Sequence, residues 1–242
     1  MEPQTYRRMA EIQEKHWWYE GRRKILASMI SGLGLPARAD ILEVGCGPGA
    51  NLNMLKPFGM VTGVEPDDFA IIHARNVSGC RVEKGILPDG LMVRGPFDLI
   101  GAFDVIEHVD EDLESLKTIK DLLRTGGHAV FTVPAYPFLW SQHDVVNHHK
   151  RRYVLPQFRE LLASAGFDVT FISYYNTLLF PLIVAVRMLK KILKMKDVPD
   201  ETMPRLPFVN VALAEVFAFE RHILKYKPMP FGVSIIAVCR KP

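Results

Sequence analysis

The fold is decided by the stretch Ile41-Leu42-Glu43-Val44-Gly45-Cys46-Gly47-Pro48-Gly49. A short apolar run carries one acid, and three glycines then follow at alternate positions. Apolar residues that lead into glycines are typical of a buried parallel strand that ends in a tight loop. Glycine in such a loop can take positive φ and lets a ligand lie against the bare backbone. The stretch therefore predicts a strand, a ligand-binding loop and a helix over residues 50–55.

Glu43 indicates which kind of ligand this loop takes. A dinucleotide-binding turn reads G-x-G-x-x-G and holds a pyrophosphate at a helix N-terminus. Here the spacing is G-x-G-x-G, and a carboxylate precedes the first glycine by two residues. That carboxylate would repel a pyrophosphate, whereas it suits a cationic ligand such as S-adenosylmethionine, which carries a sulfonium and an ammonium. A glycine-rich turn without a ligand is the alternative.

The stretch resembles motif I of the class I S-adenosylmethionine-dependent methyltransferases, E/D-x-G-x-G-x-G, and matches it at Glu43, Gly45, Gly47 and Gly49. The resemblance implies an α/β fold with a doubly wound, seven-stranded, mostly parallel sheet whose last strand is antiparallel. It also implies that S-adenosylmethionine is the cofactor, held by Glu43 and by the glycine loop, Cys46 included.

Length and composition bound the class of protein. A chain of 242 residues, 48% of them apolar, is long enough for one large α/β domain and too apolar for a disordered protein. The net charge of +3 is too small to imply a nucleic-acid partner, so we expect none. The three cysteines show neither disulfide nor zinc spacing, and the N-terminus lacks an apolar signal segment, which together predict a cytoplasmic protein.

The second and third strands are expected to hold the nucleoside part of the cofactor. The second strand, over residues 60–65, ends on Glu65, and a carboxylate at this point can accept from both ribose hydroxyls. Pro66 stops that strand and belongs to the expected cofactor site. A third strand is expected over residues 80–84. Family members often carry an acid for the adenine after it, whereas this chain has Ile86, which we expect to form an apolar wall for adenine.

The fourth strand, over residues 97–103, leads to a second family signature. Its sequence, with Glu107-His108-Val109 beyond it, resembles the F-D…E-H-V pattern of small-molecule methyltransferases. The resemblance implies that Phe103 and Asp104 flank the methionine part of the cofactor and that Glu107 and His108 face the substrate. His108 could instead be a structural residue that bonds a neighbouring loop. A helix over residues 113–123 and a fifth strand over residues 128–134 are expected to follow.

The loop after the fifth strand holds the densest chemistry. It resembles H-D-x-x-x-x-H-x-R-R-Y, found in many bacterial class I methyltransferases, at His143, Asp144, His149, Arg151, Arg152 and Tyr153. Three interpretations stay open. A histidine acts as general base with Asp144 as its orienting partner, or His143, Asp144 and His149 bind a divalent metal, or the cluster is structural. Our site prediction takes both histidines and Asp144 as catalytic, Arg151, Arg152 and Tyr153 as substrate-binding, and includes no metal.

Two helical regions flank the expected core, which spans residues 39–175 and 232–242. Residues 1–38 predict one or two helices that form a lid, from which Tyr19 or Arg23 reaches the substrate. On a helix the adjacent Trp17 and Trp18 point about 100° apart, so we expect only one to face the core. Residues 176–231 predict a helical cap before the last strand. Its basic helix contains Lys190, Lys191, Lys194 and Lys196. The helix has fewer apolar residues than a bilayer span needs, but its charge suits an anionic membrane surface.

These patterns predict methyl transfer from S-adenosylmethionine to a small or lipid-linked acceptor, with O-methylation favoured. The alternative is a non-catalytic cofactor-binding or scaffold protein with the same fold, and the histidine-rich loop disfavours it. A nicotinamide-dependent oxidoreductase is disfavoured by Glu43 and by the glycine spacing. Peripheral membrane contact and a homodimer through the apolar cap are further expectations.

Overall fold

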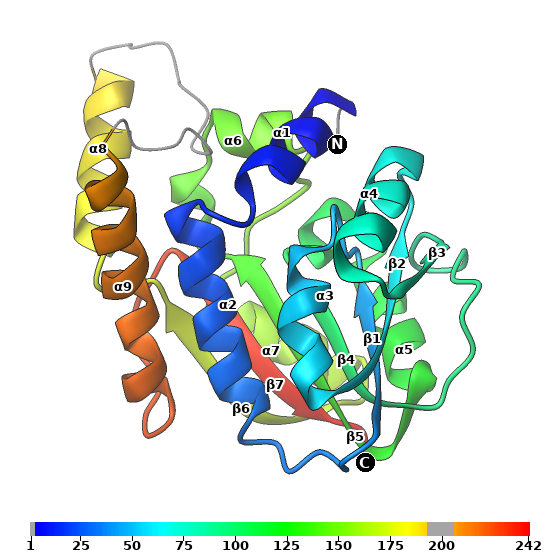
Figure 1. The fold of residues 1–242 in the computed structure, drawn as a ribbon. Helices are drawn as coiled ribbons and strands as arrows, with labels where there is room; N and C mark the ends of the chain where they lie inside the picture. The colour runs from blue at the N-terminus through cyan, green and yellow to red at the C-terminus, as the bar shows by residue number, and fades with distance from the viewer. Residues whose placement is uncertain (1–2, 193–205) are drawn as a thin grey trace.

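A single mixed sheet forms the centre of the computed structural model, which describes residues 3–192 and 206–242 (Figure 1). Its seven strands have the order β3-β2-β1-β4-β5-β7-β6. The strands are β1 (Ala39–Val44), β2 (Gly59–Glu65), β3 (Arg81–Lys84), β4 (Phe97–Phe103), β5 (Leu123–Pro134), β6 (Asp168–Tyr175) and β7 (Ser234–Arg240). The pairs among β1 to β5 are parallel, and β7 is antiparallel to β5 and β6. The predicted doubly wound sheet with an antiparallel last strand is confirmed.

Helices cover both faces of this sheet (Figure 1). They are α1 (Pro3–Ile12), α2 (Trp17–Ile30), α3 (Ala50–Leu55), α4 (Asp68–Ser78), α5 (Asp112–Leu122), α6 (Gln142–Val146), α7 (Leu155–Ser164), α8 (Phe180–Ile192) and α9 (Pro207–Leu224), with short 3-10 turns η1 (Lys56–Phe58), η2 (Ile106–His108) and η3 (Pro137–Leu139). One apolar core packs α5 and α7 on the sheet, and a second packs α2 and α9 on its other face. The carboxyl ends of β1, β2 and β4 lie at one edge of the sheet, between the helices of its two faces. This edge is where α/β sheets bind ligands.

The N-terminal region forms two helices, which is one of the two arrangements predicted, with His16 as N-cap of the second. Two local predictions differ from the structure. Strand β5 begins at Leu123 rather than at residue 128, because Gly126 and Gly127 pair with the backbone of Lys241 and continue the strand. The segment expected as a loop after β5 contains α6, which opens with a capping box between Ser141 and Asp144. Neither difference moves the site predicted at the carboxyl ends of the strands.

The two adjacent tryptophans both contact α9, which the sequence argument did not allow. Trp18 stacks on Phe217 with ring centroids 5.2 Å apart, and Trp17 meets the same ring edge-on at 6.1 Å. Trp17 is the first residue of α2, and its backbone N–H donates to Asn210 of α9. Gly21 makes the close approach possible, because a Cβ there would lie 2.5 Å from the Phe217 ring. The expectation that only one tryptophan faces the core was wrong because both indoles, at the first turn of α2, reach the same Phe217 ring of α9.

Helices α8 and α9 lie between β6 and β7, and this confirms the helical insertion before the last strand. The buried Glu220 carboxylate of α9 accepts from the backbone N–H groups of Asn176 and Leu178, each at 2.7 Å. Lys194 and Lys196 of the predicted basic helix lie outside the described residues, as do the side chains of Lys190 and Lys191. In the described part of the chain, no helix combines the length and apolarity needed to cross a membrane.

Candidate active site

The glycine loop after β1 takes the left-handed backbone that its sequence predicted. Gly45, Gly47 and Gly49 have φ values of +67°, +52° and +97°. A Cβ on Gly45 would lie 2.6 Å from Val105, and one on Gly49 would lie 2.7 Å from the backbone of Ala74 in α4. A Cβ on Gly47 would have nothing nearer than the Met9 sulfur at 3.5 Å. Gly45 and Gly49 therefore allow close packing, while Gly47 presents bare backbone to the cavity described below.

Glu65 ends β2 beside this loop and is almost fully buried. Its Oε2 accepts from the Gly47 N–H at 2.9 Å, and its Oε1 accepts from the Asp67 N–H at 3.2 Å. The Tyr6 hydroxyl of α1 also donates to it, and burial raises the pKa of the Glu65 carboxyl against these hydrogen bonds. Glu65 thus connects the glycine loop to β2 through Gly47 and connects both to α1 through Tyr6.

Glu43 lies behind the loop. It is fully buried, does not line the cavity, and its Oε1 accepts from Asn51 Nδ2 at 2.8 Å, while Oε2 has no partner among the described residues. Asn51 does line the cavity. Burial raises the pKa of Glu43 to about 8, although the Asn51 hydrogen bond and the Arg22 charge lower it. Asn51, which the sequence did not single out, therefore links Glu43 to the cavity by a hydrogen bond.

The raised pKa of Glu43 predicts a pH-dependent stability. The folded chain keeps this proton up to about pH 8, while the unfolded chain releases it near the ordinary value of 4.5. Between these pH values the folded state binds more protons, so the free energy of unfolding falls as pH rises. Glu43→Gln removes this titration, and we expect the variant to gain a few kcal/mol over the wild type from pH 5 to pH 8, at about 1.4 kcal/mol per pKa unit.

Urea unfolding of both proteins at pH 5 and pH 8 measures this gain. The exposed Glu114→Gln is the matched control and should show no such dependence. An equal difference between Glu43→Gln and the wild type at both pH values would mean that Glu43 is ionised in the folded chain throughout.

Asp104 follows β4 and is held in an unusual backbone conformation. Its φ is +58°, which costs a non-glycine residue free energy and occurs often at functional sites. Its Oδ1 accepts from Thr132 Oγ1 at 2.9 Å, and its Oδ2 pairs with the buried guanidinium of Arg22 from α2. The sequence argument proposed Tyr19 or Arg23 as the residue of α2 that reaches the site. Both line the cavity, but Arg23 donates to the backbone carbonyls of Gln13 and Glu14, and Arg22 makes the contact with Asp104.

One cavity of about 670 Å³ joins these elements. Its lining includes most of the predicted cofactor site, namely Gly45, Cys46, Gly47, Glu65, Pro66, Ile86, Phe103 and Asp104. It also includes Tyr19, Glu107, His108, His143, His149 and Arg152 from the predicted catalytic and substrate sets. The topology therefore brings the glycine loop and the histidine-rich loop to one space, although nearly 100 residues separate them in sequence.

A buried ion pair orients His149. His149 Nδ1 lies 2.8 Å from Asp144 Oδ1, and Arg152 binds the same carboxylate through Nε at 2.7 Å and Nη2 at 3.0 Å. Burial raises the pKa of Asp144, but the His149 hydrogen bond and the Arg152 charge outweigh it and hold that pKa well below its usual range. An ionised carboxylate only accepts, so Nδ1 carries the proton, and Nε2 of a neutral His149 has a free lone pair.

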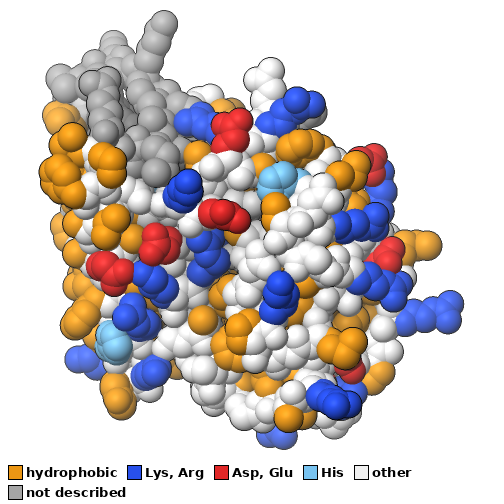
Figure 2. All heavy atoms as spheres, in the orientation of Figure 1, with side chains coloured by type: hydrophobic (Ala, Val, Ile, Leu, Met, Phe, Trp, Pro, Cys, Tyr) orange, Lys and Arg blue, Asp and Glu red, His pale blue; other side chains and the backbone are white. Residues whose placement is uncertain are grey.

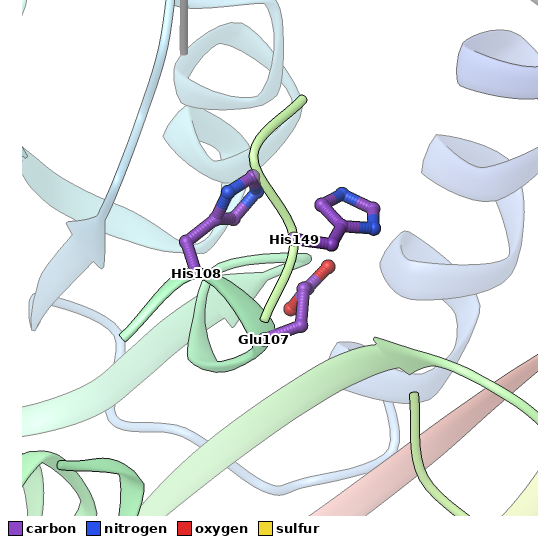
Figure 3. A group of neighbouring side chains, drawn as sticks. All are labelled: Glu107, His108 and His149. Atoms are coloured by element: carbon purple, nitrogen blue, oxygen red, sulfur yellow. The ribbon is translucent and has the colours of Figure 1, made fainter. Parts of the chain in front are cut away.

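Glu107 and His108 on η2 lie beside His149, and the backbone N–H of Lys150 donates to the Glu107 carbonyl at 2.8 Å (Figure 3). The rings of His108 and His149 are nearly perpendicular, with centroids 4.6 Å apart. Burial, and then the charge of His149, lower the pKa of His108 to about 3. Glu107 is fully buried, and burial followed by the charge of Asp104 raises the pKa of its carboxyl well above the ordinary value. Burial therefore favours the neutral forms of both Glu107 and His108.

Two residues predicted to bind substrate have other partners. Arg151 donates to Asp112 Oδ2 at 2.7 Å and to the Asp110 carbonyl, and the buried Tyr153 hydroxyl donates to the same Asp112 oxygen at 2.9 Å. Neither lines the cavity. Their placement favours the structural interpretation for this end of the loop. His143 does line the cavity and lies against His149, with ring centroids 5.7 Å apart.

Comparison with known sequences gives a family match over most of the chain. The sequence model of the family described as "Methyltransferase domain" matches residues 17–171. The ubiquinone biosynthesis O-methyltransferase of Vibrio parahaemolyticus is 28% identical over 149 residues, which are 54% of this chain and 63% of that protein. Human thiol S-methyltransferase TMT1B is 27% identical over 138 residues, 51% of this chain and 57% of that protein. The chain thus spans less than two thirds of the length of these relatives.

Solved structures share the fold over nearly the whole chain. A methyltransferase of Haloferax volcanii, solved in complex with the Trm112 methyltransferase activator, matches with a TM-score of 0.63 at 16% sequence identity. The match covers 99% of this chain and 95% of that one. At this identity the likeness shows the fold alone.

Proposed function

The chain belongs to the methyltransferase domain family, and from this premise we propose that it transfers a methyl group to a hydroxyl group of an apolar acceptor. Its cofactor is S-adenosylmethionine, which supplies an electrophilic methyl group bound to a sulfonium. One observation carries the proposal: the glycine loop, Glu65 and the Glu107–His108–His149 cluster line the same cavity. Methyl transfer needs the cofactor and the acceptor oxygen aligned in one space, and such alignment contributes much of the rate.

The residues around the glycine loop fit a cationic nucleoside cofactor. Gly47 offers unobstructed backbone, and Glu65 is buried at the point where such sheets bind ribose. Three donors already use Glu65, from Gly47, Asp67 and Tyr6. A carboxylate has about four acceptor positions, so binding two ribose hydroxyls requires the Tyr6 hydroxyl of α1 to turn away. We propose that α1 and α2 act as a lid whose opening frees Glu65.

His149 is proposed to act on the acceptor oxygen. A hydroxyl that becomes a methyl ether forms an O–C bond, while the bond from that carbon to sulfur breaks and its electron pair stays on sulfur. The hydroxyl proton must leave, and His149 allows this in two ways. Its Nε2 accepts the proton directly, or it helps to bind a cation that makes the hydroxyl more acidic. In both cases Asp144 is the positioning residue, because it fixes the ring through Nδ1.

The apolar part of the cavity wall supports an apolar acceptor. The lining includes Leu179 just before α8, Leu182, Ile183 and Val186 in the first half of α8, and Leu213 of α9. Trp17 and Trp18 of α2 line it as well. Such a wall excludes water and favours a hydrophobic small molecule or the apolar part of a lipid-linked one. The Vibrio relative, named as a ubiquinone biosynthesis O-methyltransferase, supports oxygen as the acceptor atom.

The predicted loop pattern H-D-x-x-x-x-H-x-R-R-Y remains part of this proposal. Asp144, His149 and Arg152 form the ion pair that orients the imidazole, whereas Arg151 and Tyr153 anchor the loop on Asp112. These contacts give five positions of the pattern a physical purpose: Asp144 and Arg152 orient the ring of His149, while Arg151 and Tyr153 fix the loop through Asp112. The pattern thus supports a place among bacterial small-molecule methyltransferases.

A panel of acceptors tests the proposed reaction. The full chain is incubated with S-adenosylmethionine labelled in its methyl group and with alkyl-tailed phenols and alcohols, each paired with its amine and thiol analogue. We expect label in the hydroxyl-bearing compounds, at rates at least tenfold above their amine analogues, because a hydroxyl oxygen is a weak nucleophile until its proton leaves and the cluster is placed to handle that proton. Transfer to amines or thiols alone would contradict O-methylation. Cofactor binding without transfer to any compound would favour the scaffold alternative.

The outer face of the helical insertion supports a second proposal, which concerns contact with a membrane or with another copy of the chain. Figure 2 shows apolar side chains gathered over α8 and α9 on the left of the molecule. Those more than two fifths exposed include Leu182, Val186, Met188, Leu189, Phe208, Val211, Val216 and Phe219. Such a patch favours peripheral contact with a membrane or pairing of two chains. Co-sedimentation with vesicles would support the first, and a concentration-dependent doubling of mass would support the second.

A further inference from the structure

Three side chains that can ligate a metal meet at the cavity wall (Figure 3). Glu107, His108 and His149 each offer one ligand atom, and these atoms lie within 4.8 Å of one another. We propose that they bind one divalent cation and that this cation holds the oxygen of the methyl acceptor. The catalytic role rests on the proposed function, whereas binding of the cation does not.

Both imidazoles are prepared for such a role. His149 donates from Nδ1 to the Asp144 carboxylate, and His108 donates from its ring to the backbone carbonyl of Asn147. Each ring therefore has one nitrogen fixed as a donor, which leaves the other with a lone pair in the neutral form. Metal-binding histidines almost always donate their second ring N–H to a carboxylate or carbonyl in this way, which fixes the ring orientation.

Glu107 supplies the observation that a purely structural cluster does not explain. Its side chain is fully buried and lines the cavity, yet neither carboxyl oxygen has a hydrogen-bond partner on any other described residue. An isolated buried carboxylate is costly unless it is paired or coordinates a metal. The two nearby cations have other partners, since Arg22 pairs with Asp104 and Arg152 binds Asp144 through two nitrogens. A bound cation would satisfy Glu107 and offset its charge.

The distances and donor types indicate the class of metal. Three atoms no more than 4.8 Å apart can share a centre about 2.8 Å away, so shifts of less than about 1 Å would bring them to the usual 2.0–2.2 Å. Two imidazoles and one carboxylate suit Zn²⁺, Mn²⁺ or Fe²⁺ better than Ca²⁺ or Mg²⁺, which prefer oxygen ligands. Three protein ligands also leave coordination positions open, as catalytic sites require.

The alternative set named from the sequence, His143, Asp144 and His149, lacks a free carboxylate. Asp144 Oδ1 accepts from His149 and Arg152, and its Oδ2 accepts from Arg152 and from the Ser141 backbone N–H. Its oxygens are therefore occupied within the protein. The same contacts make Asp144 an outer partner that orients His149 toward the cation.

Methyl transfer at this site needs only the acceptor, the cofactor and water as the proton acceptor. An acceptor hydroxyl on the cation is more acidic and loses its proton to water. Its oxygen then forms the bond to the methyl carbon while the carbon–sulfur bond breaks and the electron pair stays on sulfur. In this form His149 binds the cation through Nε2 and does not carry the proton.

Calorimetric titration of the chelator-treated full chain with ZnCl₂ and, separately, MnCl₂ tests the site without cofactor or acceptor. We expect one ion per chain. Glu107→Gln and His149→Ala should each weaken binding at least tenfold, while His148→Asn, next to the site but outside the ligand set, should leave it unchanged. Mn²⁺ guards against zinc binding by cysteine thiols, because manganese prefers oxygen and imidazole ligands.

Two outcomes would overturn the proposal. One is that the wild type takes up neither ion stoichiometrically. The other is that Glu107→Gln, which replaces a buried carboxyl by an amide of the same shape and should fold as well as the wild type, binds as tightly. Neither outcome affects methyl transfer with His149 as a direct base, and a failure of methyl transfer would not affect the binding result.

Discussion

Replacing His149 with alanine is expected to lower the rate of methyl transfer at least 100-fold while the affinity for S-adenosylmethionine changes less than threefold. General acid–base groups contribute about 10²–10⁴ in rate, and loss of a ligand to an activating cation has an effect of similar size. The cofactor affinity should persist, because Glu65 and Gly47 contact different elements from the loop that carries His149. Single-turnover rates with an acceptor from the panel and calorimetric titration with the cofactor measure the two quantities.

A matched control and a rescue experiment separate chemistry from folding. His148 precedes His149, is exposed and has a φ of +56°, so His148→Asn keeps a residue type that tolerates this backbone. We expect its rate to stay within threefold of the wild type. Added imidazole should restore part of the lost rate of His149→Ala, because it can occupy the space of the missing ring beside Asp144. Joint loss of cofactor binding and of the folded state in His149→Ala would favour a structural role for the loop.

Replacing Glu65 with alanine is expected to weaken S-adenosylmethionine binding at least tenfold, which corresponds to about 1.4 kcal/mol. The variant loses the acceptor for the ribose hydroxyls, and hydrogen bonds to charged groups contribute about 1.5–3 kcal/mol each. It also releases the Gly47 and Asp67 N–H groups, which position the glycine loop. In the wild type the cofactor must displace the Tyr6 hydroxyl from Glu65, and the variant avoids this cost. The expected loss of binding free energy is therefore close to the value of a single hydrogen bond.

Asp68→Asn is the control for this experiment. Asp68 lies three residues away, is largely exposed and pairs with Lys84, so its replacement should leave cofactor affinity unchanged. Calorimetry of both variants with S-adenosylmethionine and S-adenosylhomocysteine gives the comparison. Equal affinities of Glu65→Ala and the wild type would show that the cofactor does not use the end of β2.

The sheet and the glycine loop could be predicted because local sequence determines them. The apolar run from Ile41 to Val44 marks β1, and the alternate glycines mark its turn in any tertiary context. Glu65 could be placed because an acid followed by proline marks a strand end. The fold then brings these ends together at one edge of the sheet, which makes a shared site expected from topology alone.

Contacts between distant segments could not be predicted in the same way. Arg22 shares a helical row with Trp18 and Leu26, a pattern that indicates an inward face but does not identify Asp104 as its partner. The donation from Tyr6 to Glu65 depends on where α1 lies, and the orientation of Glu43 away from the cavity depends on Asn51. Glu107 and His149 meet only because η2 and the loop after α6 face each other.

Parallel calorimetric titrations of the wild-type chain with S-adenosylmethionine and with a reduced nicotinamide dinucleotide test the central claim most directly. The account predicts one molecule of S-adenosylmethionine bound per chain and no binding of the dinucleotide, because the glycine spacing departs from the dinucleotide pattern and Glu65 places a carboxyl at the cavity wall. Binding of the dinucleotide by a folded chain that does not bind S-adenosylmethionine would contradict the proposed methyl transfer.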